Sequence, residues 1–255
     1  MTDQASPDFV QSLARGLAVI RAFDADHASL SLSEVATRTD IPRAAARRFL
    51  RTLETLGYVR SDGRAFSLTP HVLELGFSYL SGLSLPEVVQ PHLERLSHRV
   101  DESVSSAVLD GTDIVYVARV HTRRIMSVRI TIGTRFPAHA TSMGRVLLAG
   151  MGDAARDAAV AASTDLHLTE KTLTGAALAA ELDRVRAQGW AMVDGELEPG
   201  LRSVAAPVHD RSGAVIAALN VSTSTTRVSE ERVRDEYLPA LLETAGAVDA
   251  ELRLV

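Results

Sequence analysis

Cysteine is absent from this 255-residue sequence, and Lys171 is its single lysine. Without cysteine the chain forms no disulfide and no thiolate metal site, and we predict no metal. No basic start followed by an apolar run and small residues marks a signal peptide. No apolar run approaches the roughly 20 residues that span a bilayer. We therefore expect a cytoplasmic protein without membrane association.

The motifs of enzymes are also scarce. The sequence has no GxGxxG after a strand, no GxxxxGK[ST] and no HExxH. GLSLP at residues 82–86 lacks the last glycine of a nucleophile elbow. We therefore predict neither an enzyme nor a cofactor. The alternative is a small-carboxylate hydrolase using Ser142, His139 and Asp194, whose only candidate base lies three residues from the serine on a loop.

What remains is the composition of a globular protein. Apolar residues make up 46% of the chain and charged residues 23%, with a net charge of −5. These values are typical of a chain that buries real cores, and the length fits about two domains. Because the whole chain is acidic, a local excess of arginine needs an explanation.

Three amphipathic helices are predicted near the N-terminus. The first spans about residues 12–23, and the second begins with Ser31 or Ser33 as its N-cap. A short turn leads to Pro42, which suits the first position of a third helix over residues 42–56. The order of these helices is that of a helix-turn-helix.

The third helix has an apolar face and an arginine face. At about 100° per residue, its apolar side chains gather on one side and its arginines on the other. Residues 38–64 hold seven arginines against three acidic side chains, so the positive excess is local. A helix that reads the major groove uses its N-terminal residues and arginines to reach guanine or phosphate. The alternative is a solvated helix face, as in most charge runs.

A hairpin completes this first domain. Residues 58–60 and 65–68 flank an Asp-Gly turn at 61–64, which is a hairpin signal. Together with the helices it predicts a winged helix-turn-helix that binds a double-stranded DNA operator. A nucleoid protein that binds DNA without sequence preference is a further alternative. The predicted DNA contacts are Ser33, Pro42, Arg43, Ala44, Arg47, Arg48, Arg51, Arg60 and Arg64.

The pattern changes after this domain, which covers residues 1–70. A linker helix is expected over 71–82 and a second domain over 83–255. Its predicted strands are 103–109, 114–120, 125–132, 190–193, 202–209 and 214–222. Its predicted helices begin at Ser84, cover 142–150, 154–162 and 175–188, and end with one from Ser229 interrupted at Pro239. Antiparallel strands with segregated helices indicate an α+β fold with a GAF- or PAS-like sheet.

Two stretches of the second domain are typical of a ligand site. FPAHATSMGR (136–145) places small polar residues at a helix start, where free N–H groups favour a carboxylate. VDGELEPGLRSV (193–204) is a polar loop between strands, and the apolar run VIAALNVST carries two polar residues opposite it. The predicted effector contacts are Thr141, Ser142, Met143, Gly144, Asp194, Glu196, Arg202, Ser203, Asn220 and Ser222. The alternative is that Ser142 is only an N-cap and Arg202 a surface residue.

These motifs together resemble the IclR family of bacterial transcriptional regulators over nearly the whole chain. The resemblance rests on SLARGLAVIRAF, the helix-turn-helix through LETLGYV, FPAHATSMGRVLLA, and LEPGLRSVAAPV with ALNVSTSTTRVS. It is most similar to the subgroup that controls aromatic-acid catabolism. ARVHTRRIMSVRITIGTRFPAHATSMGRVLLA carries most of that subgroup signal.

The resemblance implies an N-terminal DNA-binding domain and a C-terminal domain that binds a small organic acid. It implies homodimers, commonly paired into tetramers, on palindromic operators. The implied pocket uses the positions of Thr141–Gly144, Asp194, Ser203, Asn220 and Ser222. Protocatechuate, 4-hydroxybenzoate and β-ketoadipate are candidate effectors, with a 2-oxo acid from another catabolic pathway as the alternative. Some members hold a metal through cysteine and histidine; this chain has no cysteine, so that metal is not carried over.

Overall fold

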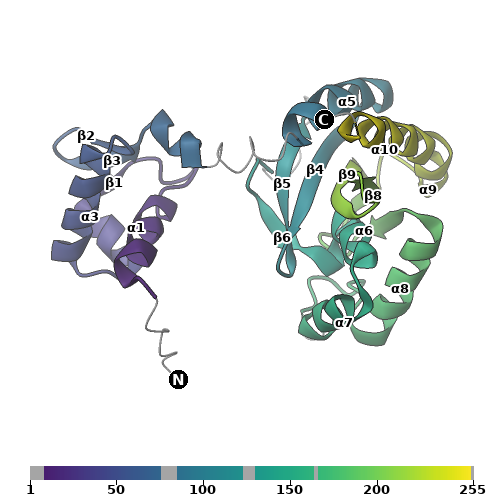
Figure 1. Ribbon diagram of the computed structural model, residues 1–255, viewed down its shortest axis with the longest axis horizontal. Coiled ribbons are helices and arrows are strands. Elements are labelled where there is room, and N and C mark those ends of the chain that lie inside the picture. Colours follow the sequence, from purple (N-terminus) through teal and green to yellow (C-terminus); the bar gives the residue numbers. More distant parts are fainter. Residues whose placement is uncertain (1–8, 76–84, 123–129, 164–165, 254–255) are drawn as a thin grey trace. The chain divides into compact units, whose positions relative to one another are not determined.

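The computed structural model describes residues 9–75, 85–122, 130–163 and 166–253. The chain divides into two compact units, Met1–Gly82 and Leu83–Val255. Figure 1 shows the helices and strands of each unit.

The N-terminal unit contains a helix-turn-helix and a small three-stranded sheet. Its elements are α1 (Gln11–Arg21), β1 (Leu30–Ser31), α2 (Leu32–Thr39), α3 (Arg43–Thr55), β2 (Val59–Ser61) and β3 (Ala65–Leu68). The antiparallel sheet has the order β1-β3-β2. The predicted winged helix-turn-helix is therefore confirmed, with β1 as a strand that the sequence reasoning missed.

The starts of α2 and α3 are fixed by particular residues. Ser31, and not Ser33, is the N-cap of α2, because its Oγ accepts the N–H of Glu34 while the Glu34 carboxylate accepts the N–H of Ser31. Pro42 is extended and precedes α3, so the helix begins one residue later than predicted. The core of this unit is formed by Val19, Ala22, Phe23, Leu30, Val35, Ile41, Ala46, Leu50, Leu53 and Val59.

The C-terminal unit is built on a six-stranded antiparallel sheet. Its order is β6-β5-β4-β9-β8-β7. The strands are β4 (Ser103–Asp110), β5 (Asp113–Val120), β6 (Arg135–Pro137), β7 (Ala191–Asp194), β8 (Leu201–His209) and β9 (Val215–Ser224). The central pair is β4 and β9, in which Ser105 stands opposite Asn220 and Ser103 opposite Ser222. The predicted α+β fold is confirmed.

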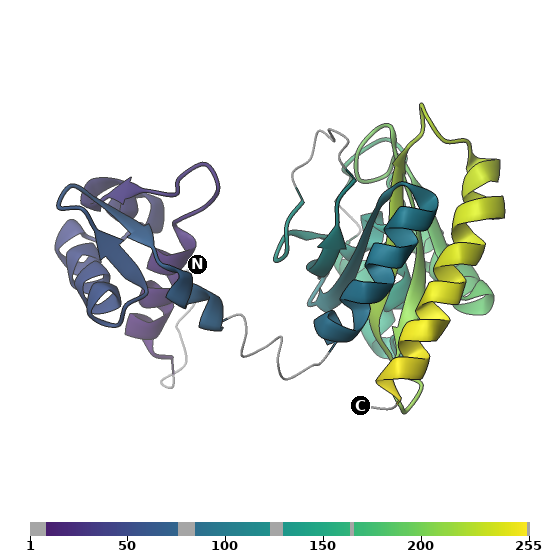
Figure 2. The ribbon, with the colours of Figure 1, turned by 90° about the horizontal axis from the view of Figure 1, so that it is seen from above.

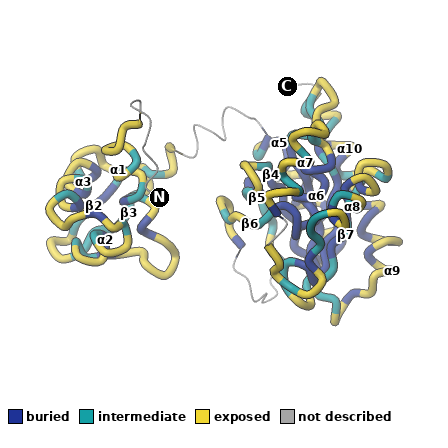
Figure 3. Tube along the Cα trace, turned by 90° about the horizontal axis from the view of Figure 1, so that it is seen from below, coloured by how far each residue is buried: buried dark blue, intermediate teal, exposed yellow. Residues whose placement is uncertain are grey.

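Helices cover both faces of this sheet. They are α5 (Leu85–Val100), α6 (Ser142–Gly150), α7 (Asp153–Ala162), α8 (Gly175–Gln188), α9 (Glu230–Arg232) and α10 (Leu238–Leu252). Figures 1 and 2 show α5 and α10 side by side on one face, whereas α6 and α8 lie on the other. The described strands and α6 are largely buried between these layers, as Figure 3 shows.

One predicted strand differs from the structure. Of the predicted strand 125–132, residues 125–129 lie outside the described residues, and residues 130–132 form no strand. Ile132 is 61% exposed, so the alternation that predicted a half-buried strand does not correspond to burial there. The edge strand of the sheet is β6 instead, and the short helical turn η2 (Ala138–Ala140) follows it directly.

Two predicted helices also need comment. The predicted helix 71–80 begins as a 3-10 turn, η1 (Pro70–Val72), and residues 76–80 lie outside the described residues, as does Ser84. The helix predicted from Ser229 with an interruption at Pro239 passes through a π-helical turn (Val233–Tyr237), and α10 then begins at Leu238, one residue before Pro239. Proline has no N–H to donate, and a wider turn accommodates the missing bond. Among the described helices, none has the length and apolarity required to cross a membrane.

Candidate functional site

The N-terminal unit presents an exposed row of arginines on α3. Arg43, Arg47, Arg48 and Arg51 are exposed, and Ala46, Leu50 and Leu53 on the opposite side are buried. In the described part of the chain none of the four arginines pairs with a carboxylate. Their guanidinium groups are therefore available to an external anion or base edge.

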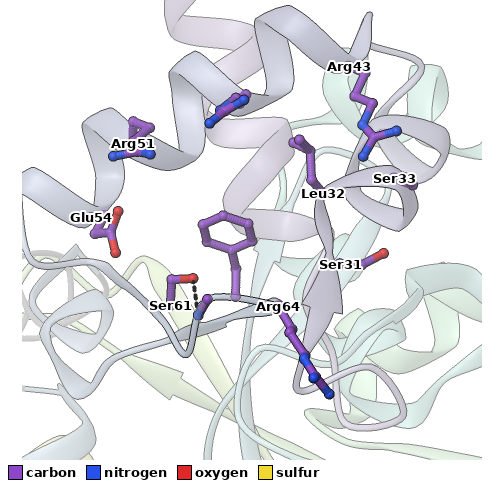
Figure 4. A pocket seen from close by; sticks show the side chains of 11 residues that line it. Ser31, Leu32, Ser33, Arg43, Arg51, Glu54, Ser61 and Arg64 are labelled. Atoms are coloured by element: carbon purple, nitrogen blue, oxygen red, sulfur yellow. Dashed lines mark hydrogen bonds between the residues drawn. The ribbon is translucent and has the colours of Figure 1, made fainter.

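The arginine row borders a groove between α3 and the hairpin of β2 and β3. Figure 4 shows Arg43 and Arg51 along α3 and Arg64 on the hairpin. The groove is lined by Ser31, Leu32, Ser33, Arg43, Arg47, Arg51, Glu54, Ser61, Gly63, Arg64 and Phe66. Five predicted DNA contacts are among these residues. The other four, Pro42, Ala44, Arg48 and Arg60, are exposed but do not line the groove.

The hairpin tip is held by a network around Asp62. Its Oδ1 accepts the backbone N–H groups of Arg64 at 2.9 Å and Ala65 at 2.8 Å. These bonds, that from Ala65 first, lower the pKa of the Asp62 carboxyl. Gly63 has a φ of +91°, a left-handed conformation that glycine adopts without strain. Arg64 therefore follows a fixed turn.

The turn between α2 and α3 is similarly defined. Asp40 adopts a left-handed φ of +50° and ends α2. The N–H of Ile41 then bonds to the carbonyl of Ala36 at 3.1 Å, and the Ile41 side chain is buried. This anchors the start of α3 to the core and leaves its arginines outside.

A buried cavity lies in the C-terminal unit, on the side of the sheet that faces α6. Six of the predicted effector contacts line it, namely Thr141, Ser142, Met143, Ser203, Asn220 and Ser222. The remaining lining residues are Tyr116, Ile130, Ala140, Val193, Leu197 and Leu201. One wall is thus polar and the others apolar, the combination that small-molecule sites use.

The start of α6 forms the polar end of this cavity. Thr141, and not Ser142, is the N-cap, because its Oγ1 accepts the N–H of Gly144 at 3.1 Å. Ser142 is the first helical residue, and its Oγ donates to Oγ of Ser203 at 2.8 Å. The first N–H groups of a helix have no partner within it, so Ser142 and Met143 bring both hydroxyl and amide polarity to the wall.

Gly144 does not line the cavity, but it allows α6 to approach η2. A Cβ atom at Gly144 would stand 2.1 Å from the carbonyl oxygen of Ala138. Only glycine permits this contact between the two backbones.

Three predicted effector contacts are engaged in ion pairs and do not line the cavity. Arg202 donates to Asp194 through Nε and Nη2, and to the carbonyl of Val228 through Nη1. Glu196 is 7% exposed and accepts from Nη2 of Arg145. These side chains hold the loop between β7 and β8 in place.

Arg145 is a residue that the sequence reasoning missed. It is 1% exposed, and its Nε donates to the carbonyl of His139 at 3.0 Å. Its guanidinium therefore connects α6 to η2 and to the Glu196 loop. The available signal was a charged residue in SMGRVLLA, where every position from 142 to 149 is buried.

Burial shapes the electrostatics of the sheet around the cavity. Burial raises the pKa of Tyr116 to about 12, so its phenol stays neutral at physiological pH. Burial lowers the pKa of the Arg119 guanidinium, which lies 5.9 Å from the Tyr116 ring centroid and donates to Ser105 Oγ at 2.8 Å. Among the described residues no group of three histidine, aspartate or glutamate side chains could hold a metal ion.

The N-terminal helix-turn-helix unit has a row of exposed arginines on α3, and the C-terminal unit has a buried cavity with a polar wall. Together they define a DNA-binding regulator that carries its own sensor domain. Comparison with known proteins agrees with this class. Residues 12–63 match the family model described as the IclR helix-turn-helix domain. Residues 77–250 match the one described as the bacterial transcriptional regulator IclR C-terminal domain. The chain belongs to the IclR family of bacterial transcriptional regulators.

Individual relatives are similar over almost the full chain. The Pca regulon regulatory protein of Pseudomonas putida is 49% identical over 92% of this chain and 82% of its own. A solved structure from Rhodococcus sp. RHA1 is 56% identical, with a TM-score of 0.87 over 96% of this chain and 98% of its own. An IclR homologue from Microbacterium hydrocarbonoxydans, complexed with 4-hydroxybenzoate, is 26% identical, with a TM-score of 0.86 over 96% of this chain and 100% of its own. The family members are transcriptional regulators and not enzymes, so the hydrolase alternative is not favoured.

Proposed function

We propose that this chain is a cytoplasmic regulator of aromatic-acid degradation genes whose operator affinity changes when a small carboxylic acid binds the C-terminal cavity. The observation that carries the proposal is the cavity, with its serine and helix-start wall and its apolar sides. Support for an aromatic acid comes from the Pca regulon relative and from the homologue complexed with 4-hydroxybenzoate.

The proposed acid binds with its carboxylate toward Ser142, Ser203 and the N-terminus of α6. Backbone N–H groups at a helix start and hydroxyl donors stabilise such an anion. Thr141, Met143, Asn220 and Ser222 complete the contacts. Asp194, Glu196 and Arg202 act by holding the loop, because their charges are already paired.

Side chains must move when the acid binds. The cavity volume is about 20 Å³, which is room for about one water molecule. Met143 is unbranched and rotates readily, and Leu197 belongs to a loop bounded by Gly195 and Gly200, both with positive φ. Movement of this wall on binding is a means by which the acid favours one state of the protein over another.

At the operator, α3 enters the major groove with Arg43, Ala44, Arg47, Arg48 and Arg51 facing the bases and phosphates. Arg64 and Arg60 of the hairpin, with Ser33 and Pro42, contact the flanking backbone. The active form is a homodimer, or a pair of dimers, because two copies of α3 match the two halves of a palindromic operator.

Alanine substitution tests this placement of the reading face. Arg47→Ala and Arg51→Ala should each weaken operator binding by about 1–3 kcal/mol if the side chain contacts a base. Arg211→Ala is the control, because Arg211 is an exposed arginine in the other unit. Fluorescence anisotropy with a DNA fragment from the region upstream of the gene that encodes this chain gives the dissociation constants. Unchanged affinity in both α3 variants would refute the placement.

A thermal-shift screen tests the effector. An acid at 100 times its dissociation constant stabilises the folded state by about 2.7 kcal/mol, which raises the melting temperature by roughly 5–10 °C for a domain of this size. A shift with an aromatic acid that disappears in Ser203→Leu supports the proposal. No shift with any acid of the aromatic pathway would contradict it.

A further inference from the structure

The sheet face that lines the cavity carries polar residues in neighbouring strands. Asn220 of β9 stands opposite Ser105 of β4 and Ala205 of β8, and Ser222 stands opposite Ser103 and Ser203. Residues two apart on a strand share a face, so Asn220 and Ser222 belong to the same wall. This wall has more hydrogen-bonding groups than a carboxylate alone requires.

Asn220 is the residue of this wall whose hydrogen bonding is incomplete. Its side chain is 2% exposed and lines the cavity. Its Nδ2 donates to Oγ of Ser222 at 2.9 Å, whereas its Oδ1 is buried and has no hydrogen-bond partner among the described residues. Buried polar atoms nearly always have a partner, and an atom without one inside a cavity is a place for a ligand group.

The chemistry of Oδ1 defines that group. An amide oxygen accepts hydrogen bonds and donates none, so it pairs with an O–H or N–H group of the ligand. Ser222 is held on the other side of the amide, where its Oγ accepts from Nδ2. The serine hydroxyls and the start of α6 bind the anion, and Asn220 provides an acceptor nearby.

We propose that Oδ1 of Asn220 accepts a hydrogen bond from a hydroxyl group of the effector, and that Asn220 thereby selects hydroxy-substituted aromatic acids. This inference rests on the proposed function. It separates the candidate effectors, because 4-hydroxybenzoate and protocatechuate carry an O–H donor at neutral pH. Ionised β-ketoadipate and simple 2-oxo acids present only acceptors, and they leave Oδ1 unpaired.

Calorimetric titration of the full chain with 4-hydroxybenzoate and 4-fluorobenzoate tests the proposal. The two acids have similar size and the same carboxylate, but fluorine cannot donate a hydrogen bond. The native chain should bind 4-hydroxybenzoate at least about tenfold more tightly. In Asn220→Ala this ratio should fall to within about threefold, because the acceptor is gone.

Ser106→Ala is the matched control. Oγ of Ser106 is also buried without a partner in the described part of the chain. Ser106 pairs with Leu219 in register, so it lies on the opposite face of the sheet. The binding ratio should be unchanged in this variant. If the ratio falls equally in Ser106→Ala, the effect is general loosening of the sheet and the proposal is wrong.

If Asn220→Ala does not fold, the affinities of the native chain for the different acids still decide the proposal. Equal affinity for 4-hydroxybenzoate and 4-fluorobenzoate would overturn this inference and leave the proposed function standing. Tighter binding of β-ketoadipate than of 4-hydroxybenzoate and protocatechuate would do the same. Absence of binding by every acid would overturn both.

Discussion

Gly144 shows how a single missing side chain positions the cavity. The start of α6 approaches Ala138 so closely that a Cβ atom at this position would lie 2.1 Å from a carbonyl oxygen. This contact brings Thr141 and Ser142 against the strands, where Ser142 reaches Ser203. The glycine thus supports the site without lining the cavity.

Gly144→Ala is expected to destabilise the C-terminal unit by about 3 kcal/mol, because backbone atoms must move apart. Urea unfolding followed by the fluorescence of Trp190, the single tryptophan of the sequence, measures this unit. Gly152→Ala is the control, since a Cβ there meets no atom within 4 Å. A loss in Gly144→Ala no larger than in the control would contradict the close approach.

His139 is the central, buried residue of η2, and its Nε2 lies 2.9 Å from the carbonyl oxygen of Leu166. Burial first, and Arg145 in addition, lower its pKa below the usual 6.5. The unfolded chain therefore takes up a proton at a higher pH than the folded chain does. The contribution of neutral His139 to folding stability is fully present above about pH 6.5 and is lost as the pH decreases below that value.

Between about pH 7.5 and about pH 5.5, the free energy of unfolding should accordingly decrease more steeply in the native chain than in His139→Gln. Glutamine keeps a donor for Leu166 but does not titrate. Trp190 fluorescence at three pH values in this window gives the slopes. Parallel slopes for the two proteins would show that His139 does not titrate in this range.

At the scale of elements, the loop between β7 and β8 is attached to α6 by one buried ion pair. Arg145 and Glu196 are 1% and 7% exposed, and Oε2 of Glu196 also accepts the N–H of Leu173 at 3.0 Å. A buried charge without its partner is far less stable than the pair or than an apolar replacement of both.

Glu196→Leu should therefore destabilise the C-terminal unit by about 3–5 kcal/mol. It leaves the buried Arg145 guanidinium with only the longer contact to Glu181, at 4.0 Å from Nη1. Adding Arg145→Met should recover a large part of that loss, although the Leu173 N–H remains without its acceptor. Urea unfolding of the native chain, both single variants and the double variant completes a double-mutant cycle, which gives the interaction energy between the two side chains. Strictly additive losses would mean that the two side chains do not interact.

Elements with a strong period could be predicted from the sequence. Helices 142–150 and 175–188 have the observed bounds, because apolar residues recur at helical spacing. Thr141 caps the start of the first helix, and Gly189 ends the second in a left-handed conformation. Short strands such as β1 and β6 have two and three residues and therefore no measurable period. Their position is decided by pairing with distant residues, Leu30 with Phe66 for example.

The stretches that form the cavity could also be predicted, but not the side chains that face it. Small polar residues at a helix start identify 141–144, yet only the folded backbone shows that Thr141 caps and Ser142 bonds to Ser203. Asp194, Glu196 and Arg202 were predicted as contacts because they lie in or beside the polar loop between two strands, and Asp194 also because the family resemblance implies it. Asp194 and Arg202 pair with each other. Glu196 bonds to Arg145 and Arg202 to the carbonyl of Val228, both distant in sequence, so local patterns could not reveal these two contacts.

At the scale of the whole molecule, the chain combines a DNA-reading unit and a sensing unit, as expected of the IclR family to which it belongs. Regulation requires that the acid has different affinities for two states that differ in operator affinity. Such coupling is typically about 1–3 kcal/mol, whether the acid increases or decreases DNA binding.

The most direct test is operator affinity measured by fluorescence anisotropy with and without saturating 4-hydroxybenzoate. We predict a change of roughly 5- to 150-fold in the native chain and no change in Ser203→Leu, whose larger side chain fills the cavity. Identical affinity with and without the acid, in a protein that binds both operator and acid, would contradict ligand-gated regulation.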